Sequence, residues 1–291
     1  MQHISIENSR GDAWPIDNTQ SLRASGVVGL GLEFDNEYLS ENGNSRIEKQ
    51  TLKLSQFQAD FHFGKRIDEV AYQVYYSFVE FLSYTPLYLV YSTDADQKKT
   101  LITMTSLSKS QMQQGNFLKE SFVVDRLSPW YKIKHAQIRQ KSNSVTTRGK
   151  VYSFVRPYVY TQNSREKTSG YKLKNKSIYL TTNKERMSPL KITVSGYCIN
   201  PYWEVFQGSK LVASDSYSLT LQDGQKLTVS SLFQERTAIL TDQNGVESSV
   251  YQQQDITKSG FVHAPIGEST IVFHVGNASV DVEIYEEADL F

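Results

Sequence analysis

The sequence predicts a mainly β protein with one α-helix. Most apolar residues recur at every second position within short segments, which is the period of half-buried strands. Only one segment shows convincing apolar spacings of three and four, the period of an amphipathic helix. Short strands separated by regular polar turns fill the C-terminal third, a pattern typical of a β-sandwich.

The first clear strand is QFQADFHF at 56–63, where Phe57, Ala59, Phe61 and Phe63 alternate with polar residues and so share one face. The preceding residues 51–54 alternate in the opposite phase. We therefore expect a bulge near Ser55 to join both segments into one strand.

Residues 66–82 predict the helix. Apolar side chains recur there at helical spacing, and Asp68 and Glu69 lie in the first turn, where the helix dipole favours acidic groups. Pro86 prevents the helix from continuing. Beyond it, segments 87–91 and 100–107 flank a polar turn and predict a hairpin, and a further strand is expected within 117–127.

The last hundred or so residues predict short strands joined by turns. The final two segments, 268–275 and 278–285, flank Gly276-Asn277, and a loop of two such residues predicts a β-hairpin. The other expected strands are 191–197, 202–206, 211–212, 217–221, 225–229 and 237–240.

Composition excludes several classes of protein. Of 291 residues, 31 are basic and 31 acidic, so the chain is neither a global polycation for nucleic acid nor an acidic tail protein. A single cysteine, Cys198, excludes an intrachain disulfide and a cysteine-based metal cluster. We find no apolar run that would span a membrane and no signal-peptide core near Met1, so we expect a protein folded in a reducing compartment.

The charge is distributed unevenly. Residues 1–131 carry 12 basic and 16 acidic side chains, residues 132–191 carry 15 and 2, and residues 192–291 carry 4 and 13. The basic segment is either a solvated connector with short strands or a basic surface that meets an acidic surface on the same chain or on a copy of it. Nucleic-acid binding is a third interpretation, against which the segment lacks any known recognition motif.

No catalytic constellation is present. Phosphate-binding glycine loops, nucleophile elbows and zinc-protease motifs do not occur, and the five histidines lack ligand-like spacing, so we expect neither a metal nor a cofactor. Asp94 and Asp96 form a carboxylate pair, but polar turns commonly carry two aspartates. Cys198 is interpreted as a buried structural thiol.

One aromatic cluster suggests a contact site. Trp203, Tyr202 and Tyr197 lie close together in sequence and could form a platform on which a glycan or a partner stacks. The competing interpretation places them in the core of the sandwich, as expected from the general burial of aromatic residues.

The order of motifs resembles a known family. The helix AYQVYYSFVEFL is followed by PLYLVY at 86–91, SLSKSQ at 106–111 and the ending FVVDRLSPWY at 122–131. In this order and spacing the motifs resemble the distal tail proteins of bacteriophages with long, non-contractile tails. SPLKITVSGYCINPYWEVF and the segment after APIGEST resemble the galectin-like sandwich found in many of these proteins.

The resemblance implies an architecture and a role. It implies an N-terminal belt domain at 1–134 with one helix and a β-hairpin, a basic connector at 135–187 and a C-terminal galectin-like sandwich at 188–291. Such proteins are non-enzymatic hubs, in which six copies form a ring at the tail tip of the virion. The implied partners are further copies, the major tail protein or tail tube, a tail-tip protein and receptor-binding or other baseplate proteins. The chain would be made in the bacterial cytoplasm.

Two other functions remain open. The C-terminal sandwich could be a carbohydrate-binding module that recognises cell-wall glycans through the aromatic cluster. The chain could also be a wall hydrolase with a carboxylate pair, although the sequence nominates no such pair.

Overall fold

The computed structural model describes residues 3–17, 22–64, 71–111, 118–138, 169–180, 186–233 and 235–289. It forms two compact units, each with its own hydrophobic core. Unit 1 comprises Met1–Lys132, Ser177–Lys184 and Glu286–Phe291, and unit 2 comprises Ile133–Lys176 and Glu185–Tyr285. Both units are therefore assembled from segments that are separate in the sequence.

Unit 1 is built on an antiparallel sheet in the order β2-β1-β7-β8-β9-β6-β3. The predicted hairpin is confirmed, because β7 pairs with β8 around the polar turn. Strand β10 (Trp130–Ile138) pairs with β8 through Tyr131 and continues into unit 2. The strands are β1 (His3–Glu7), β2 (Ala13–Pro15), β3 (Leu22–Val28), β6 (Phe57–Phe63), β7 (Leu87–Ser92), β8 (Gln97–Leu107) and β9 (Leu118–Arg126).

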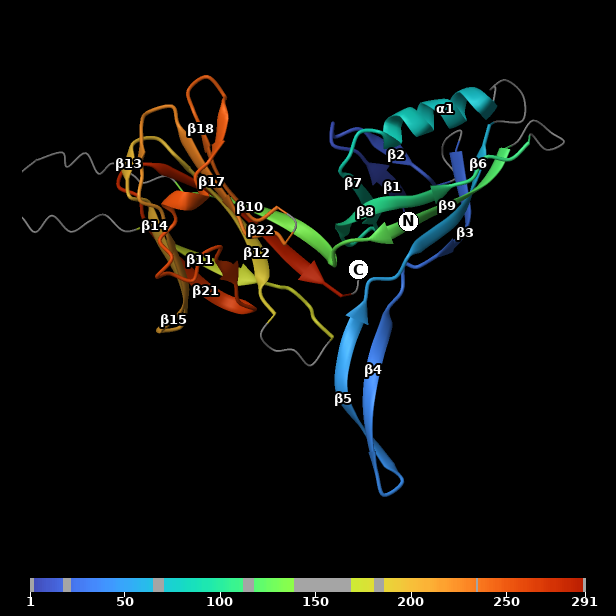
Figure 1. Ribbon diagram of the computed structural model, residues 1–291, viewed down its shortest axis with the longest axis horizontal. Coiled ribbons are helices and arrows are strands. Elements are labelled where there is room, and N and C mark those ends of the chain that lie inside the picture. Colours follow the sequence, from blue (N-terminus) through green and yellow to red (C-terminus); the bar gives the residue numbers. More distant parts are fainter. Residues whose placement is uncertain are drawn as a thin grey trace, which may run out of the picture. The chain divides into compact units, whose positions relative to one another are not determined.

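Helix α1 (Ala71–Leu82) packs against this sheet (Figure 1). Its buried face includes Phe78, which contacts Phe61 of β6 and Phe122 of β9. The predicted start of the helix, at residues 66–70, lies outside the described residues. Within the described ranges α1 is the one α-helix, so the mainly β fold with a single helix is confirmed.

Residues 51–63 do not form one bulged strand, contrary to the prediction. β5 (Asn44–Lys53) pairs only with β4 (Glu33–Glu41) among the described strands, whereas β6 pairs with β3 and β9. The bulge expected near Ser55 is instead the point where the chain leaves the β4–β5 hairpin and enters the main sheet of unit 1. Figure 1 shows the β4–β5 hairpin extending away from the rest of unit 1.

Unit 2 is a β-sandwich. One sheet has the order β19-β18-β17-β12-β22, and the other has the order β11-β21-β14-β15. Alternate residues of both sheets form one core, including Ile192 and Val282 from the first sheet and Trp203 and Phe273 from the second. The two-sheet sandwich expected from the strand spacing is present; its likeness to galectins stays a prediction.

The strands of unit 2 match most of the predicted segments. β20 (His263–Ala264) pairs with the start of β12, and β13 (Cys198–Ile199) pairs with β16 (Thr220–Leu221). The other strands are β11 (Ser169–Asn175), β12 (Ser188–Ser195), β14 (Tyr202–Gln207), β15 (Lys210–Ser216), β17 (Lys226–Ser230), β18 (Thr237–Thr241), β19 (Glu247–Ser249), β21 (Gly267–His274) and β22 (Ser279–Ala288, ending in unit 1).

The predicted hairpin between the last two strands is wrong. β21 pairs with β11 and β14, whereas β22 pairs with β12 in the other sheet. The turn itself forms, since the Ala278 amide donates to the Val275 carbonyl and Gly276 has φ of +60°. This turn therefore carries the chain from one layer of the sandwich to the other.

Most of the basic segment 132–191 lies outside the described residues, so the structure does not decide between its interpretations. Across the described ranges, we find no helix with the length and apolar character needed to cross a bilayer.

Candidate functional site

The β4–β5 hairpin is the most exposed element of unit 1. A two-residue Asn42-Gly43 loop closes it, with φ of 52° and 77°, and Glu41 pairs with Asn44 directly across the loop. Positive φ at both loop residues is the geometry that asparagine and glycine favour in tight hairpins. This Asn-Gly pair is a hairpin signal that is present in the sequence itself.

The two faces of the hairpin differ in chemistry. Phe34 pairs with Leu52, and Tyr38 pairs with Ile47, so these four side chains share one face. Tyr38 is 60% exposed and Ile47 is 53% exposed. The hairpin therefore presents an apolar face that is open to solvent within this chain.

The opposite face is charged. Lys53 Nζ lies 2.8 Å from Glu33 Oε1, and Lys49 Nζ lies 3.2 Å from Glu37 Oε1. Exposed pairs of this kind contribute little to stability, because water and salt screen them. An isolated two-stranded hairpin is only marginally stable in water. We therefore expect another surface to cover the apolar face and stabilise the hairpin.

The base of the hairpin fixes its exit from the main sheet. A side chain at Gly29 would place its Cβ 1.7 Å from the Gln56 carbonyl oxygen, and the φ of Gly29 is +92°. Ser55 Oγ donates to the Gly29 carbonyl oxygen at 3.1 Å. Only glycine fits this close crossing of the two chain segments.

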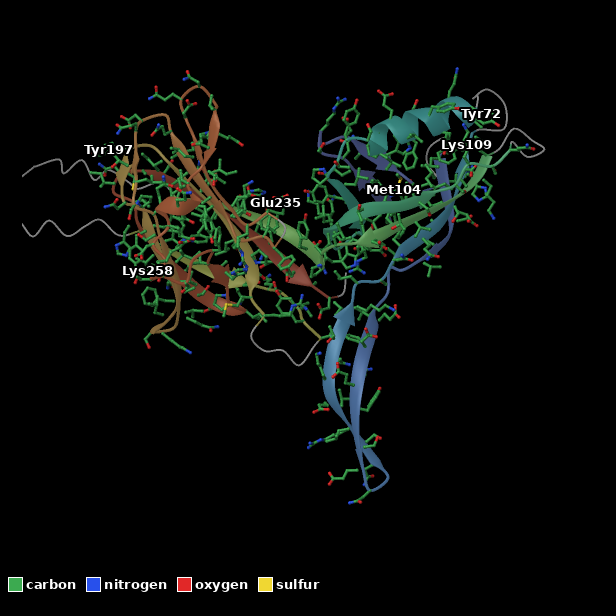
Figure 2. The ribbon with its side chains drawn as sticks, in the orientation of Figure 1. Tyr72, Met104, Lys109, Tyr197, Glu235 and Lys258 are labelled. Carbon is green, nitrogen blue, oxygen red and sulfur yellow. The ribbon has the colours of Figure 1, made fainter. Side chains whose placement is uncertain are left out.

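The SLSKSQ motif forms a clasp between α1 and the sheet. Buried Glu120 accepts hydrogen bonds from Ser108 Oγ and from the Ser110 amide, at 2.8 and 2.7 Å. Between these serines, Lys109 Nζ donates to Tyr76 Oη at 2.8 Å, and it lies over the Tyr72 ring at 6.0 Å. Figure 2 shows Tyr72 and Lys109 together at this end of unit 1. The motif therefore has a structural role within unit 1, where its contacts link α1 to the sheet.

A second candidate site is a cavity of about 810 Å³ in unit 2, which we call the Tyr197 cavity. Its walls come from the segment around β13, from β14 and from the turn after β21. The lining residues are Gly196, Tyr197, Cys198, Ile199, Asn200, Tyr202, Asp223, His274, Gly276 and Asn277. Two of the three predicted aromatic contacts, Tyr197 and Tyr202, therefore meet at one cavity.

The third residue of the aromatic cluster, Trp203, follows the competing interpretation and lies in the core. Its side chain is fully buried in the sandwich core and stacks on Tyr217, with ring centroids 5.8 Å apart. Successive residues of a strand point to opposite faces, so Trp203 faces inward while Tyr202 faces the cavity. Trp203 cannot contact a ligand at the surface.

Cys198, Asp94 and Asp96, the groups that the sequence offers for chemistry, serve structural roles. Burial raises the pKa of the Cys198 thiol to about 11, so it stays protonated and poorly nucleophilic at neutral pH. Asp96 pairs with Lys132 beside the turn it shares with Asp94. Among the described residues, no three histidine, cysteine, aspartate or glutamate side chains are grouped as a metal site.

Comparison with known proteins identifies the first part of the chain. Residues 3–127 match the family model for the N-terminal domain of distal tail proteins. The chain therefore contains a domain of the kind found at the N-terminus of distal tail proteins. The match includes the β4–β5 hairpin, α1 and the SLSKSQ clasp, so the resemblance seen in the sequence is confirmed. Among curated proteins, none matches the chain.

Solved structures extend the likeness across both units. Two structures of the phage p2 baseplate in its activated conformation, with Ca and with Sr, each match 100% of this chain and 100% of theirs, with a TM-score of 0.71 at 15% identity. A third match is the Dit protein of phage SPP1, described as a paradigm of hub adsorption apparatus in phages that infect Gram-positive bacteria. It covers 97% of this chain and 98% of its own, with a TM-score of 0.56 at 10% sequence identity. At these identities the likeness establishes a shared fold.

Proposed function

We propose that this distal tail protein is a structural hub of a phage tail tip, in which copies of the chain close into a ring. The ring has six members, as the family resemblance implies, and it joins the tail tube to the host-adsorption apparatus. The role needs no catalysis, so in this proposal the chain is not an enzyme. It resides in the virion, at the end of the tail.

The observation that carries the proposal is the apolar face of the β4–β5 hairpin. Tyr38 and Ile47 are more than half exposed in the single chain, at the far half of an element that extends from its unit. A second copy of the chain is the occupant that would cover this face in every subunit of a ring. Such a head-to-tail contact joins two different surface patches. Repeated contacts form a closed ring when the rotations between successive copies add up to a full turn.

An open sheet edge provides a further contact for a neighbour. Among the described strands, β3 pairs with β6 alone, and Val28 at its end is 62% exposed. An exposed edge offers unpaired backbone amides and carbonyls to another strand. Closure into a ring removes such edges from water, which supports assembly through this side of unit 1.

The other partners follow from the same role. The tail tube or major tail protein would meet one side of the ring, and a tail-tip protein would meet the other. Receptor-binding or other baseplate proteins would attach through unit 2. The unequal charge of the three sequence segments would help such surfaces to find a single register.

The test is the mass and image of the purified full chain. Native mass spectrometry at low salt should show a hexamer, and negative-stain electron microscopy should show a ring with an axial hole. Ile47→Glu should shift the assembly to monomers, because it places a carboxylate in the covered apolar face at a cost of roughly several kcal/mol per contact.

Leu39→Glu is the matched control. Leu39 lies on the opposite, charged face, directly across from Arg46, so a new carboxylate there should leave the ring intact. A chain that stays monomeric at every concentration up to the micromolar range would refute the ring. Equal assembly of the two variants would refute the hairpin as the contact.

A further inference from the structure

We infer that the Tyr197 cavity of unit 2 binds a neutral saccharide, with Tyr197 as the stacking platform. The inference concerns a site separate from the β4–β5 hairpin and does not depend on ring formation. Figure 2 places Tyr197 and Lys258 on unit 2; Tyr197 lines the cavity, whereas Lys258 does not line it and lies over the Tyr202 ring.

The platform is an exposed ring on a fixed backbone. The Tyr197 side chain is 51% exposed, although the residue lines a cavity. The Tyr197 amide donates to Asp223 Oδ1 at 3.3 Å, and the preceding Gly196 has φ of +100°. A partly exposed ring whose backbone is already ordered can take a flat apolar ligand face at small entropic cost.

Tyr202 and His274 form a second part of the lining, and each contacts a further polar side chain. The Tyr202 and His274 rings stack with centroids 4.9 Å apart, and His274 Nε2 lies 3.2 Å from Glu204 Oε2. Lys258 Nζ lies 5.0 Å from the Tyr202 ring centroid. Burial, together with a hydrogen bond to Glu204, raises the pKa of Tyr202 to about 12, so the phenol keeps its proton.

The remaining polar groups suit hydroxyls. Asn200, held at φ of 48°, and Asn277, in the turn after β21, line the space with side-chain amides, which both donate and accept hydrogen bonds. A sugar hydroxyl also does both. The lining residues that the structure describes include one aspartate and no lysine or arginine, so the walls favour a neutral ligand over a phosphate or a carboxylate.

The size of the space agrees with this class of ligand. About 810 Å³ lies within the roughly 300–1,000 Å³ range of small-molecule sites. A pyranose has one face of C–H groups and a rim of hydroxyls, which matches an aromatic platform beside amide and carboxylate groups. A hydrophobic ligand would leave those amides without partners, which is costly in a partly enclosed site.

The experiment is ligand-observed saturation-transfer NMR and calorimetry on the full chain. The probes are glucose, galactose, rhamnose and N-acetylglucosamine, with glycerol phosphate and choline as charged comparisons. We expect at least one neutral sugar to bind weakly, with a Kd of about 1 mM. Tyr197→Ala should weaken that binding roughly tenfold or more, and Tyr197→Phe should largely retain it.

Tyr251→Ala is the matched control. Tyr251 is 58% exposed and lies in unit 2 but lines a different cavity, so its loss should leave sugar binding unchanged. Absence of binding by all four sugars, binding of the charged probes alone, or equal binding by Tyr197→Ala and the wild type would each overturn the inference. Ring formation, measured on the same samples, separates this outcome from failure of the hub proposal.

Discussion

Asp215 is fully buried at the end of β15 and organises one side of unit 2. Its carboxylate accepts hydrogen bonds from the Phe261 amide at 2.9 Å, from Gln254 Nε2 at 3.0 Å and from Tyr217 Oη at 3.3 Å. Tyr217 in turn stacks on Trp203 in the core. One side chain thus ties the loop that carries Lys258 to the centre of the sandwich.

We predict that Asp215→Asn lowers the free energy of unfolding of unit 2 by about 1–3 kcal/mol at neutral pH. The amide offers one acceptor oxygen and turns its NH₂ group toward donors, which leaves buried donors unsatisfied. Denaturant titration followed by hydrogen-exchange mass spectrometry reports this loss separately for each unit. Tyr197→Phe, at an exposed position, serves as the control.

The effect should also depend on pH. Burial raises the pKa of Asp215 above its ordinary value of 3.8. The folded state then binds the proton more tightly than the unfolded state, so the contribution of Asp215 to stability increases as the pH falls from neutral through the folded pKa. The stability gap between wild type and Asp215→Asn should widen as the pH falls from neutral towards the ordinary pKa of 3.8. A gap that narrows would show that hydrogen bonding outweighs burial.

At the scale of single elements, α1 is held by aromatic packing. Phe78 is fully buried, and its ring lies 5.5 Å from Trp14, 5.6 Å from Phe61 and 5.9 Å from Phe122. The helix has no acidic residue in its described first turn and no basic residue in its last turn. This aromatic cluster therefore anchors the described part of the helix on the sheet.

Phe78→Ala should lower the stability of unit 1 by about 3–5 kcal/mol, because it removes a large ring and leaves a cavity. Val79→Ala, at the neighbouring 41% exposed position, should change stability by roughly 0.5 kcal/mol. Urea unfolding monitored by circular dichroism compares the two variants. Equal effects would show that the helix is held by contacts other than this cluster.

At the scale of the whole molecule, unit 1 combines segments from the middle of the sequence with its C-terminal end. Arg126 of β9 and Asp289 after β22 are both buried, and burial lowers the pKa of Arg126 to about 10 while the charge of Asp289 opposes that shift. Asp289 also accepts a hydrogen bond from the Leu180 amide at 2.7 Å. Asp289 therefore interacts with two segments that are distant from it in the sequence, at Arg126 and at Leu180.

Asp289→Ala should destabilise unit 1 by about 1–3 kcal/mol, since it removes the acceptor of the Leu180 amide and the carboxylate charge that favours the charged form of buried Arg126. The double variant Arg126→Leu with Asp289→Ala should recover much of this loss, because it also removes the buried charge. Hydrogen exchange in unit 2 provides the internal control. A double variant less stable than Asp289→Ala alone would argue against charge burial as the cause.

The sequence by itself determined the elements whose signal is local. The alternation at 56–63, the helical spacing up to Leu82 and the hairpin around 92–99 each follow from neighbours within one segment, so they could be predicted. The order of motifs also determined the resemblance to distal tail proteins. The Asn42-Gly43 turn was equally local and could have revealed the projecting hairpin.

Only the tertiary structure decided which strands pair and which aromatic rings are exposed. Alternation predicts a strand without naming its partner, so residues 51–63 looked like one strand and Gly276-Asn277 like a hairpin turn, although it connects two sheets. Tyr202 and Trp203 are adjacent and chemically alike, yet one lines a cavity and the other fills the core. The physical reason is that pairing and burial depend on residues far away in the chain, which only the folded molecule brings together.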